Sequence, residues 1–251
     1  MITAAVVDAW LRRARPLLGT IVEVGARGNQ PAVDAAVRAA FDAIADVQAR
    51  LSRFEPTSEI ARFHAMPSGT SMAIGDHAIA VLSVAQILQD DTAGMFDISL
   101  GTAPGGWRCD GSRLHKLSDK VRLDLGGIAK GYAVDRAVAA LVASGCEAGW
   151  VNAGGDVRVF GNVDLPVSLR DEQAGGVRPF ATLRDGAFAT SHFDRDSRST
   201  AWALAANPVW AHASVAAPSC LWADALTKVV AISGDTAHPL LARYGAQGWL
   251  H

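Results

Sequence analysis

The stretch V-R-L-D-L-G-G-I-A-K-G-Y-A-V-D, Val121 to Asp135, is the part of the sequence that decides the fold. It opens with a short β-rich run, Val121 to Leu125, and passes through two glycines into a helical pattern of apolar residues. This order predicts a strand–turn–helix unit. The turn carries no side chain that would block a ligand, and the first backbone N–H groups of a helix favour an anion.

Two charged residues flank this predicted turn. Asp124 lies near the end of the expected strand, and Lys130 falls within the first helical turn. An acid, a bare backbone and a base so close together indicate a phosphate and metal site. The alternative is a structural joint in which Asp124 only caps the helix, because Gly-Gly turns between strands and helices are common. The spacing matches neither the G-x-G-x-x-G fingerprint nor the G-x-x-x-x-G-K-[ST] phosphate loop.

The composition is that of a globular protein with an ample core. The chain has 251 residues, of which 50% are hydrophobic and 19% charged, and its formal net charge is −2. Nucleic acid is not an expected partner, because there is no basic excess. Cys109, Cys146 and Cys220 are odd in number and far apart, which indicates a reducing compartment and neither a disulfide framework nor a metal-binding pair.

The N-terminal residues do not have the pattern of a secretory leader. Their charges follow the short apolar run, whereas a signal peptide has them before it. No segment of about 20 apolar residues is present, so membrane insertion is not expected. The expected location is the cytoplasm, or the periplasm if a leader has been removed.

The remaining sequence alternates helical and β patterns. Pro31 is expected to open an amphipathic helix that reaches Leu51, Ser58 to cap a short helical turn, and Asp76 to cap a second helix. The first residues of the chain read as helix-like. Strands are expected at three short runs, 167–169, 180–183 and 188–191, and a hairpin at 149–161, while 194–199 reads as a solvated loop.

Three further aspartates are candidates for a functional role. Asp97 lies in the glycine-bounded run Gly94–Gly101, where it could equally be a turn residue. Asp156 follows a Gly-Gly pair in the predicted hairpin and could likewise only serve the turn. Asp224 falls inside an otherwise apolar helix, where an acid is costly unless it is paired or bound to a metal. The seven histidines show no H-x-x-x-H spacing, so zinc is not expected.

Several segments taken together resemble one family, the ApbE family of FAD:protein FMN transferases, formerly called thiamine-biosynthesis lipoproteins. The matching segments, in family order, are L-L-G-T at 17–20, L-S-R-F-E-P-T-S-E-I at 51–60, G-M-F-D at 94–97, L-D-L-G-G-I-A-K-G-Y-A-V-D at 123–135, V-N-A-G-G-D-V-R-V-F-G at 151–161, A-T-S at 189–191, and S-V-A-A-P-S-C-L-W-A-D-A-L-T-K-V at 214–229. Each segment is weak alone, but their order over nearly the whole chain is specific.

The resemblance implies a single domain over residues 1–251 with an α+β fold, in which two interlocked α/β halves hold FAD in a cleft between them. It also implies a reaction in which the FMN half of FAD is transferred to a Ser or Thr hydroxyl of an acceptor flavoprotein. AMP is released and Mg²⁺ is required. Phosphoryl transfer needs positive charge at the diphosphate, and Mg²⁺ typically takes one or two carboxylates together with phosphate oxygens.

Carried over by position, the resemblance assigns roles to individual residues. The residues expected to contact FAD are Leu18, Phe54, Met95, Phe96, Asp97, Asp124 and Lys130. The expected metal ligands are the Gly127 carbonyl, Asp224 and Thr227, and Asp224 is also expected to be catalytic.

The chain departs from the family pattern in two places. The family usually has a threonine four residues after the metal-binding aspartate, but here that position is Lys228, and Thr227 lies one residue early. A lysine could replace part of the charge of the cation, or Thr227 could take the place of the usual threonine. The family segment H-x-x-D-P-x-T-G has no good counterpart, so His192 is the nearby substitute for the general base.

These departures leave alternatives to a Mg²⁺-dependent transferase. One is a protein that binds FAD without transferring it. Another is an FAD pyrophosphatase in which water replaces the acceptor hydroxyl and the products are FMN and AMP.

Overall fold

The computed structural model describes residues 8–29, 31–170, 175–193 and 212–251. The chain begins there with a long hairpin, β1 (Asp8–Leu17) and β2 (Thr20–Asn29), paired antiparallel along its whole length. The expectation of a helix-like start is therefore wrong for the residues from Asp8 onward. The alternating residues Val22, Val24 and Ala26 of β2 are buried, so one face of β2 packs on the core, and the preceding residues pair with its backbone edge as β1.

The hairpin forms one edge of a seven-stranded sheet in the order β1-β2-β6-β7-β10-β11-β12, in which every pairing is antiparallel. The strands not yet bounded are β6 (Ala148–Ala153), β7 (Asp156–Phe160), β10 (Gly186–His192), β11 (His212–Ala217) and β12 (Gln247–Leu250). The expected hairpin at 149–161 and the strand at 188–191 are confirmed. The residues 194–199, expected to be a loop, lie outside the described part of the chain.

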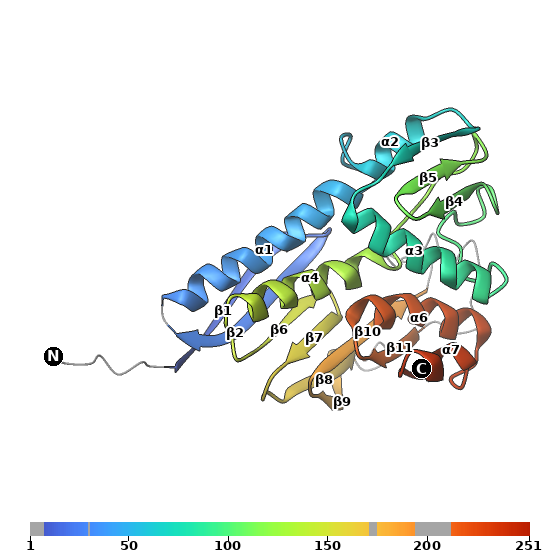
Figure 1. Ribbon diagram of the computed structural model, residues 1–251. Helices are drawn as coiled ribbons and strands as arrows, with labels where there is room; N and C mark the ends of the chain where they lie inside the picture. The colour runs from blue at the N-terminus through green and yellow to red at the C-terminus, as the bar shows by residue number, and fades with distance from the viewer. Residues whose placement is uncertain (1–7, 30, 171–174, 194–211) are drawn as a thin grey trace.

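Three helices cover this sheet and contact one another in turn: α1 (Ala32–Leu51), α4 (Ala129–Ala143) and α6 (Cys220–Ser233) (Figure 1). The helix expected from Pro31 to Leu51 is confirmed, and its buried stripe includes Val33, Phe41, Ile44 and Val47. Since α4 lies between the other two helices, its first turn is placed at the centre of the molecule.

The remaining elements lie around this layer (Figure 1). The helices α2 (Glu59–Ala65) and α3 (Asp76–Asp91) accompany a three-stranded sheet of β3 (Thr70–Ala73), β5 (Arg113–Lys116) and β4 (Trp107–Asp110). The expected second helix is confirmed as α3, but Asp76 is its first residue and not its cap, which is Gly75. The other pieces are the ribbon β8 (Leu165–Arg170) and β9 (Val177–Leu183), and α7 (Pro239–Arg243). Ser58 caps α2 by accepting the Ala61 N–H at 3.0 Å, as expected.

The segment Val121–Leu125 is not a strand, which corrects the first half of the strand–turn–helix prediction. Its backbone is bonded to loops and side chains: the Asp124 N–H donates to the Ile98 carbonyl at 2.8 Å, and the Leu123 N–H to His64 Nε2 at 2.8 Å. The second half is confirmed, since α4 begins at Ala129, two residues after the glycines. The β-rich composition reflects burial of Val121, Leu123 and Leu125, not pairing in a sheet.

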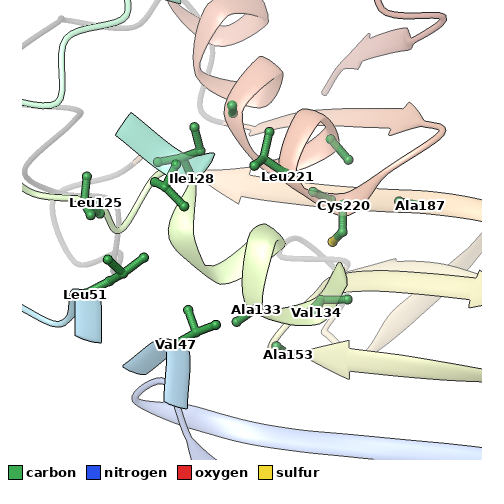
Figure 2. Packing of buried hydrophobic residues seen from close by; sticks show 14 of the residues in the cluster. Val47, Leu51, Leu125, Ile128, Ala133, Val134, Ala153, Ala187, Cys220 and Leu221 are labelled. Carbon is green, nitrogen blue, oxygen red and sulfur yellow. The ribbon is translucent and has the colours of Figure 1, made fainter. Parts of the chain in front are cut away.

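Apolar packing fixes the start of α4 in place. Figure 2 shows Leu125 and Ile128 between the end of α1, with Val47 and Leu51, and the start of α6, with Cys220 and Leu221. All these side chains belong to the main hydrophobic core. The segment 124–130 is thus held in place by its buried residues Leu125 and Ile128. This fixes the positions of the charged side chains at its two ends, Asp124 and Lys130.

Across the described residues, no helix is both long and apolar enough to span a membrane. The expected compartment, cytoplasmic or periplasmic, and the single-domain organisation over 1–251 both stay predictions.

Candidate functional site

A large cleft opens beside the first turn of α4, with a volume of about 2030 Å³. This exceeds the roughly 300–1,000 Å³ of ordinary small-molecule pockets, so it has room for an extended ligand such as a dinucleotide. Its walls come from the β1–β2 turn, the end of α1 and the loop after it, the loop leading into α4, the β6–β7 turn, the β8–β9 ribbon, and the ends of β10 and β11. Segments far apart in the sequence therefore meet at one place.

The charges lining the cleft are mostly positive. Five cationic side chains face two acidic ones; the cations are Arg53, Lys130, Arg170, Arg178 and Lys228, and the acids are Glu55 and Asp124. One acid is already paired, because Asp124 Oδ2 lies 3.3 Å from Arg53 Nε. An excess of positive charge in a concave surface attracts an anion, so a phosphate-bearing ligand is the best match in chemistry.

Behind this wall lies a buried cluster of two lysines and two aspartates. Lys130 Nζ is 2.7 Å from Asp156 Oδ2, and Lys228 contacts Asp224 Oδ1 and donates to the Asp224 carbonyl at 2.9 Å. Both aspartates are almost fully buried, whereas both lysines also line the cleft. The cluster therefore presents its ammonium groups to the cavity and keeps its carboxylates behind them.

The two buried carboxyls respond to this environment in opposite directions. Burial, together with the charge of Asp224, raises the pKa of Asp156 to about 6, against the opposing effect of Lys130 and Lys228. Burial also disfavours ionisation of Asp224, but Lys228 and Lys130 outweigh it and lower the pKa of that carboxyl. For Lys130, burial disfavours the ammonium, yet Asp156 and Asp224 hold its pKa above the usual value. Asp224 and Lys130 are thus charged at neutral pH.

Helices α4 and α6 approach closely at Gly131. A Cβ at this position would lie 2.2 Å from the Cys220 carbonyl oxygen and 2.8 Å from Asp224 Cβ, so only glycine fits. The Gly131 N–H donates to Asp224 Oδ2 at 3.0 Å. Asp224 is therefore a structural acceptor for the first turn of α4 as well as the partner of Lys228.

The cleft brings together five of the residues singled out from the sequence: Leu18, Phe54, Asp124, Lys130 and His192. Leu18 has a left-handed backbone, with φ of 53°, in the turn between β1 and β2, and its N–H donates to Gln48 Oε1 at 2.7 Å. Phe54 is 78% exposed and lies under the Arg53 guanidinium, 4.5 Å from the ring centroid. Its exposed ring is available for stacking against a ligand.

His192 lies at the end of β10, stacked on His212 with ring centroids 4.1 Å apart, and both rings line the cleft. Imidazole is the side chain best suited to exchange a proton near neutral pH. The position in the cleft is compatible with the general-base role expected for His192, which stays a prediction.

The other expected site residues do not line the cleft. Phe96 is fully buried in the core, and Met95 packs against that core. Asp97 accepts the Ser99 N–H at 2.8 Å and the Ser99 hydroxyl at 2.6 Å, which is the turn role left open as its alternative. Gly127 is buried, and Asp224 and Thr227 lie behind Lys228 and Ser191. Their roles toward a ligand are untested.

The donor set expected for Mg²⁺ does not fit a metal in this arrangement. The two oxygens of Asp224 are engaged by Lys228 and by the Gly131 N–H. The Thr227 hydroxyl donates to the Asp224 carbonyl at 2.7 Å and lies 2.7 Å from Ser191 Oγ. Within the described ranges, no three His, Cys, Asp or Glu side chains form a group that could hold a metal ion. An ammonium occupies the position beside Asp224 that a cation would need.

Sequence reasoning missed several members of this site. Arg170 and Arg178 reach the cleft from paired strands, β8 and β9, which no local pattern connects. The pairing of Asp156 with Lys130 depends on a long-range contact. A usable signal existed for Asp224 and Lys228, because an acid and a base four residues apart share one face of a helix.

Fold and site together define an α+β protein with a cationic, dinucleotide-sized cleft. The chain belongs to the ApbE family, whose sequence model matches residues 18–119 and 106–248. This confirms the family and the α+β fold class expected from the ordered motifs.

Known relatives are distant in sequence and close in fold. A protein of Treponema pallidum named FAD:protein FMN transferase is 24% identical over 239 residues, covering 73% of this chain and 66% of the relative, so the chain spans about two thirds of the length of that relative. The Thermotoga maritima ApbE protein superposes with a TM-score of 0.81 at 22% identity, covering 96% of this chain and 94% of its own. Pseudomonas stutzeri flavinyl transferase ApbE, in its apo form, gives 0.78 at 20% identity, covering 96% and 90%.

Proposed function

We propose that this chain is an FAD:protein FMN transferase, which moves the FMN half of FAD onto a Ser or Thr hydroxyl of an acceptor flavoprotein and releases AMP. The observation that carries the proposal is the cleft in which Asp124 and Lys130, from the family motif, lie with four further cations. The names of the Treponema pallidum and Pseudomonas stutzeri relatives support the same activity.

The reaction balances as a phosphoryl-type displacement. The hydroxyl oxygen of the acceptor attacks the phosphorus of the FMN half and forms a phosphoester bond, while the bridging P–O bond to the AMP half breaks. AMP leaves with the electron pair of that bond, and the hydroxyl proton passes to a base. Such transfers depend on positioning and on positive charge at the phosphates, which Lys130 and Lys228 are placed to supply.

His192 is proposed as the base, since it is an imidazole on the wall of the cleft. Asp224 is proposed to act through its neighbours: it holds Lys228 by an ion pair and the first turn of α4 by the Gly131 N–H. The Mg²⁺ requirement that the resemblance implies is untested, and the side chains expected to bind the ion are engaged with one another.

The test is an incubation of the purified protein with FAD and an FMN-binding domain as candidate acceptor, with and without Mg²⁺. A covalent mass gain of FMN on the acceptor together with AMP supports the transferase. AMP and FMN without acceptor labelling would instead identify an FAD pyrophosphatase. Tight FAD binding with neither product would identify a flavin-binding protein without transfer activity, and would contradict the proposal.

Two variants connect the assay to the site. His192→Gln is expected to slow labelling by about 100-fold while leaving the Kd for FAD unchanged, because a general base contributes about 10²–10⁴-fold. Asp224→Asn keeps an oxygen for the Gly131 N–H but loses the charge that holds Lys228, so it is expected to lower turnover strongly. Full activity of both variants would remove these two residues from the mechanism.

A further inference from the structure

We propose that Lys228 is a resident cation that takes the place of a divalent metal, so that this chain binds the diphosphate of FAD without metal. The inference rests on the proposed function for the identity of the ligand. It concerns a departure from the family pattern, since Lys228 stands where the family usually has a threonine beside its metal.

The position of the ammonium is the first support. Lys228 contacts Asp224 Oδ1 and donates to the Asp224 carbonyl at 2.9 Å, and its side chain is only 3% exposed. It nevertheless lines the cleft. A cation bound to Asp224 from the cleft side would have to occupy the same space, so the lysine and a metal exclude each other at that carboxylate.

The second support is that the other expected metal ligand is also engaged. The Thr227 hydroxyl donates its proton to the Asp224 carbonyl and accepts from Ser191, whose oxygen lies 2.7 Å away. This network leaves the hydroxyl a single lone pair and fixes its direction, so Thr227 could supply at most one of the six oxygen ligands that Mg²⁺ prefers. The Lys228 ammonium, by contrast, is already bound to Asp224 and requires no coordination by Thr227.

The third support is the charge balance of the buried cluster. Lys130 pairs with Asp156, and Lys228 pairs with Asp224, so each carboxylate already has its own cation. A dication added beside two ammonium groups would be repelled by both. An incoming diphosphate would meet two fixed positive charges, and an ammonium carries three N–H donors, of which the described contacts of Lys228 to Asp224 use two.

The experiment measures the Kd for FAD, by quenching of flavin fluorescence, in EDTA and in MgCl₂. The wild-type Kd is expected to change by less than about three-fold between the two buffers. Lys228→Thr restores the usual family residue, and its Kd is expected to rise at least about ten-fold in EDTA and to recover when Mg²⁺ is added. The matched control is Lys120→Thr, an exposed lysine outside the cleft, which is expected to behave as wild type.

Metal binding is followed directly by the electron paramagnetic resonance signal of Mn²⁺ added to the protein with FAD. No bound Mn²⁺ is expected in the wild type, and one bound ion per chain is expected in Lys228→Thr. Circular dichroism checks that this variant folds, because it leaves Asp224 without its ion-pair partner. Lys228→Arg, which keeps the charge, provides a second variant and is expected to stay metal-independent.

The outcomes separate this inference from the proposed function. Loss of wild-type FAD binding in EDTA with recovery in Mg²⁺ overturns the inference. This result comes from the wild-type protein alone, so it does not depend on whether a variant folds. Mg²⁺-dependent labelling of an acceptor would keep the transferase and reject the resident cation. Metal-free FAD binding without labelling would keep the resident cation and reject the transferase, and failure to bind FAD in either buffer would reject both.

Discussion

Asp135 and Asp224 cap each other's helices. Asp135, on α4, accepts the N–H groups of Cys220 and Leu221, the first two residues of α6, each at 2.9 Å. Asp224, on α6, accepts the Gly131 N–H in the first turn of α4 at 3.0 Å. Neither helix has a side-chain cap of its own. This exchange locks α4 against α6 at the wall of the cleft and satisfies N–H groups that would otherwise be unpaired in the interior.

The first prediction follows from the Asp135 cap. Asp135→Ala removes the acceptor of two buried N–H groups and the partner of Arg158, whose Nη1 lies 2.7 Å from it. The free energy of unfolding is expected to fall by about 2–3 kcal/mol, measured by urea denaturation. Asp164→Ala is the control, because it breaks an exposed ion pair with Arg184 and is expected to cost under about 1 kcal/mol. Equal losses in the two variants would contradict the capping role.

The second prediction concerns the contact between α4 and α6 at Gly131. Gly131→Ala would place a Cβ 2.2 Å from a backbone oxygen, and a backbone atom cannot move aside as a side-chain end can. We expect a loss of about 3 kcal/mol or more, or insoluble protein, seen in thermal unfolding. The control is Gly28→Ala, where the nearest atoms would be 3.8 Å away and the backbone is not left-handed. A Gly131→Ala variant as stable as Gly28→Ala would show that the helices do not approach this closely.

The third prediction tests Phe54 as a stacking surface. The ring is 78% exposed on the rim of the cleft, so its loss should not affect folding. Phe54→Ala is expected to raise the Kd for FAD about ten-fold, equivalent to about 1.4 kcal/mol of lost stacking, with an unchanged melting temperature. Leu117→Ala removes a side chain that is 55% exposed away from the cleft and should change neither quantity. An unaltered Kd for Phe54→Ala would exclude this ring from the ligand site.

Local patterns in the sequence predicted those parts of the fold that depend on local chemistry. The stripe on α1, the Ser58 cap and the Gly-Gly hairpin at 154–155 follow from periodicity and turn preferences, which neighbouring residues determine. The predicted strand at Val121–Leu125 was wrong because burial and β-pairing favour the same residue types. The N–H groups of Asp124 and Leu123 instead donate hydrogen bonds to Ile98 and His64, which only the tertiary structure brings near.

The sequence predicted those residues of the candidate site that lie within a recognisable motif. Asp124 and Lys130 stood out as an acid and a base around a bare turn, and both line the cleft. The meaning of Asp224 was not readable in the same way, because a buried acid in a helix suits a metal, an ion pair or a cap equally well. Only the contacts with Lys228 and Gly131 distinguish these possibilities.

The fourth prediction is a pH dependence that originates at Asp156. Its pKa in the folded protein is about 6, above the reference value of 3.8, because burial disfavours the charged form. The folded protein therefore binds the proton more tightly than the unfolded chain, so this carboxyl contributes stability below about pH 4 that is lost as the pH rises through about 6. A difference of about two units corresponds to about 3 kcal/mol.

Asp156→Asn removes this titration while the other acids remain. Urea denaturation of both proteins from pH 4 to pH 7 is expected to show the variant gaining up to about 3 kcal/mol relative to wild type as the pH rises. Lys130 stays protonated over this range, since its pKa is raised, so losing its partner shifts the variant by a constant amount. Carbon-13 NMR of the Asp156 carboxyl gives the titration midpoint directly. A midpoint near 4, the reference value, with a pH-independent stability difference would show that the Lys130 ammonium offsets burial, and that Asp156 is mostly ionised above about pH 5.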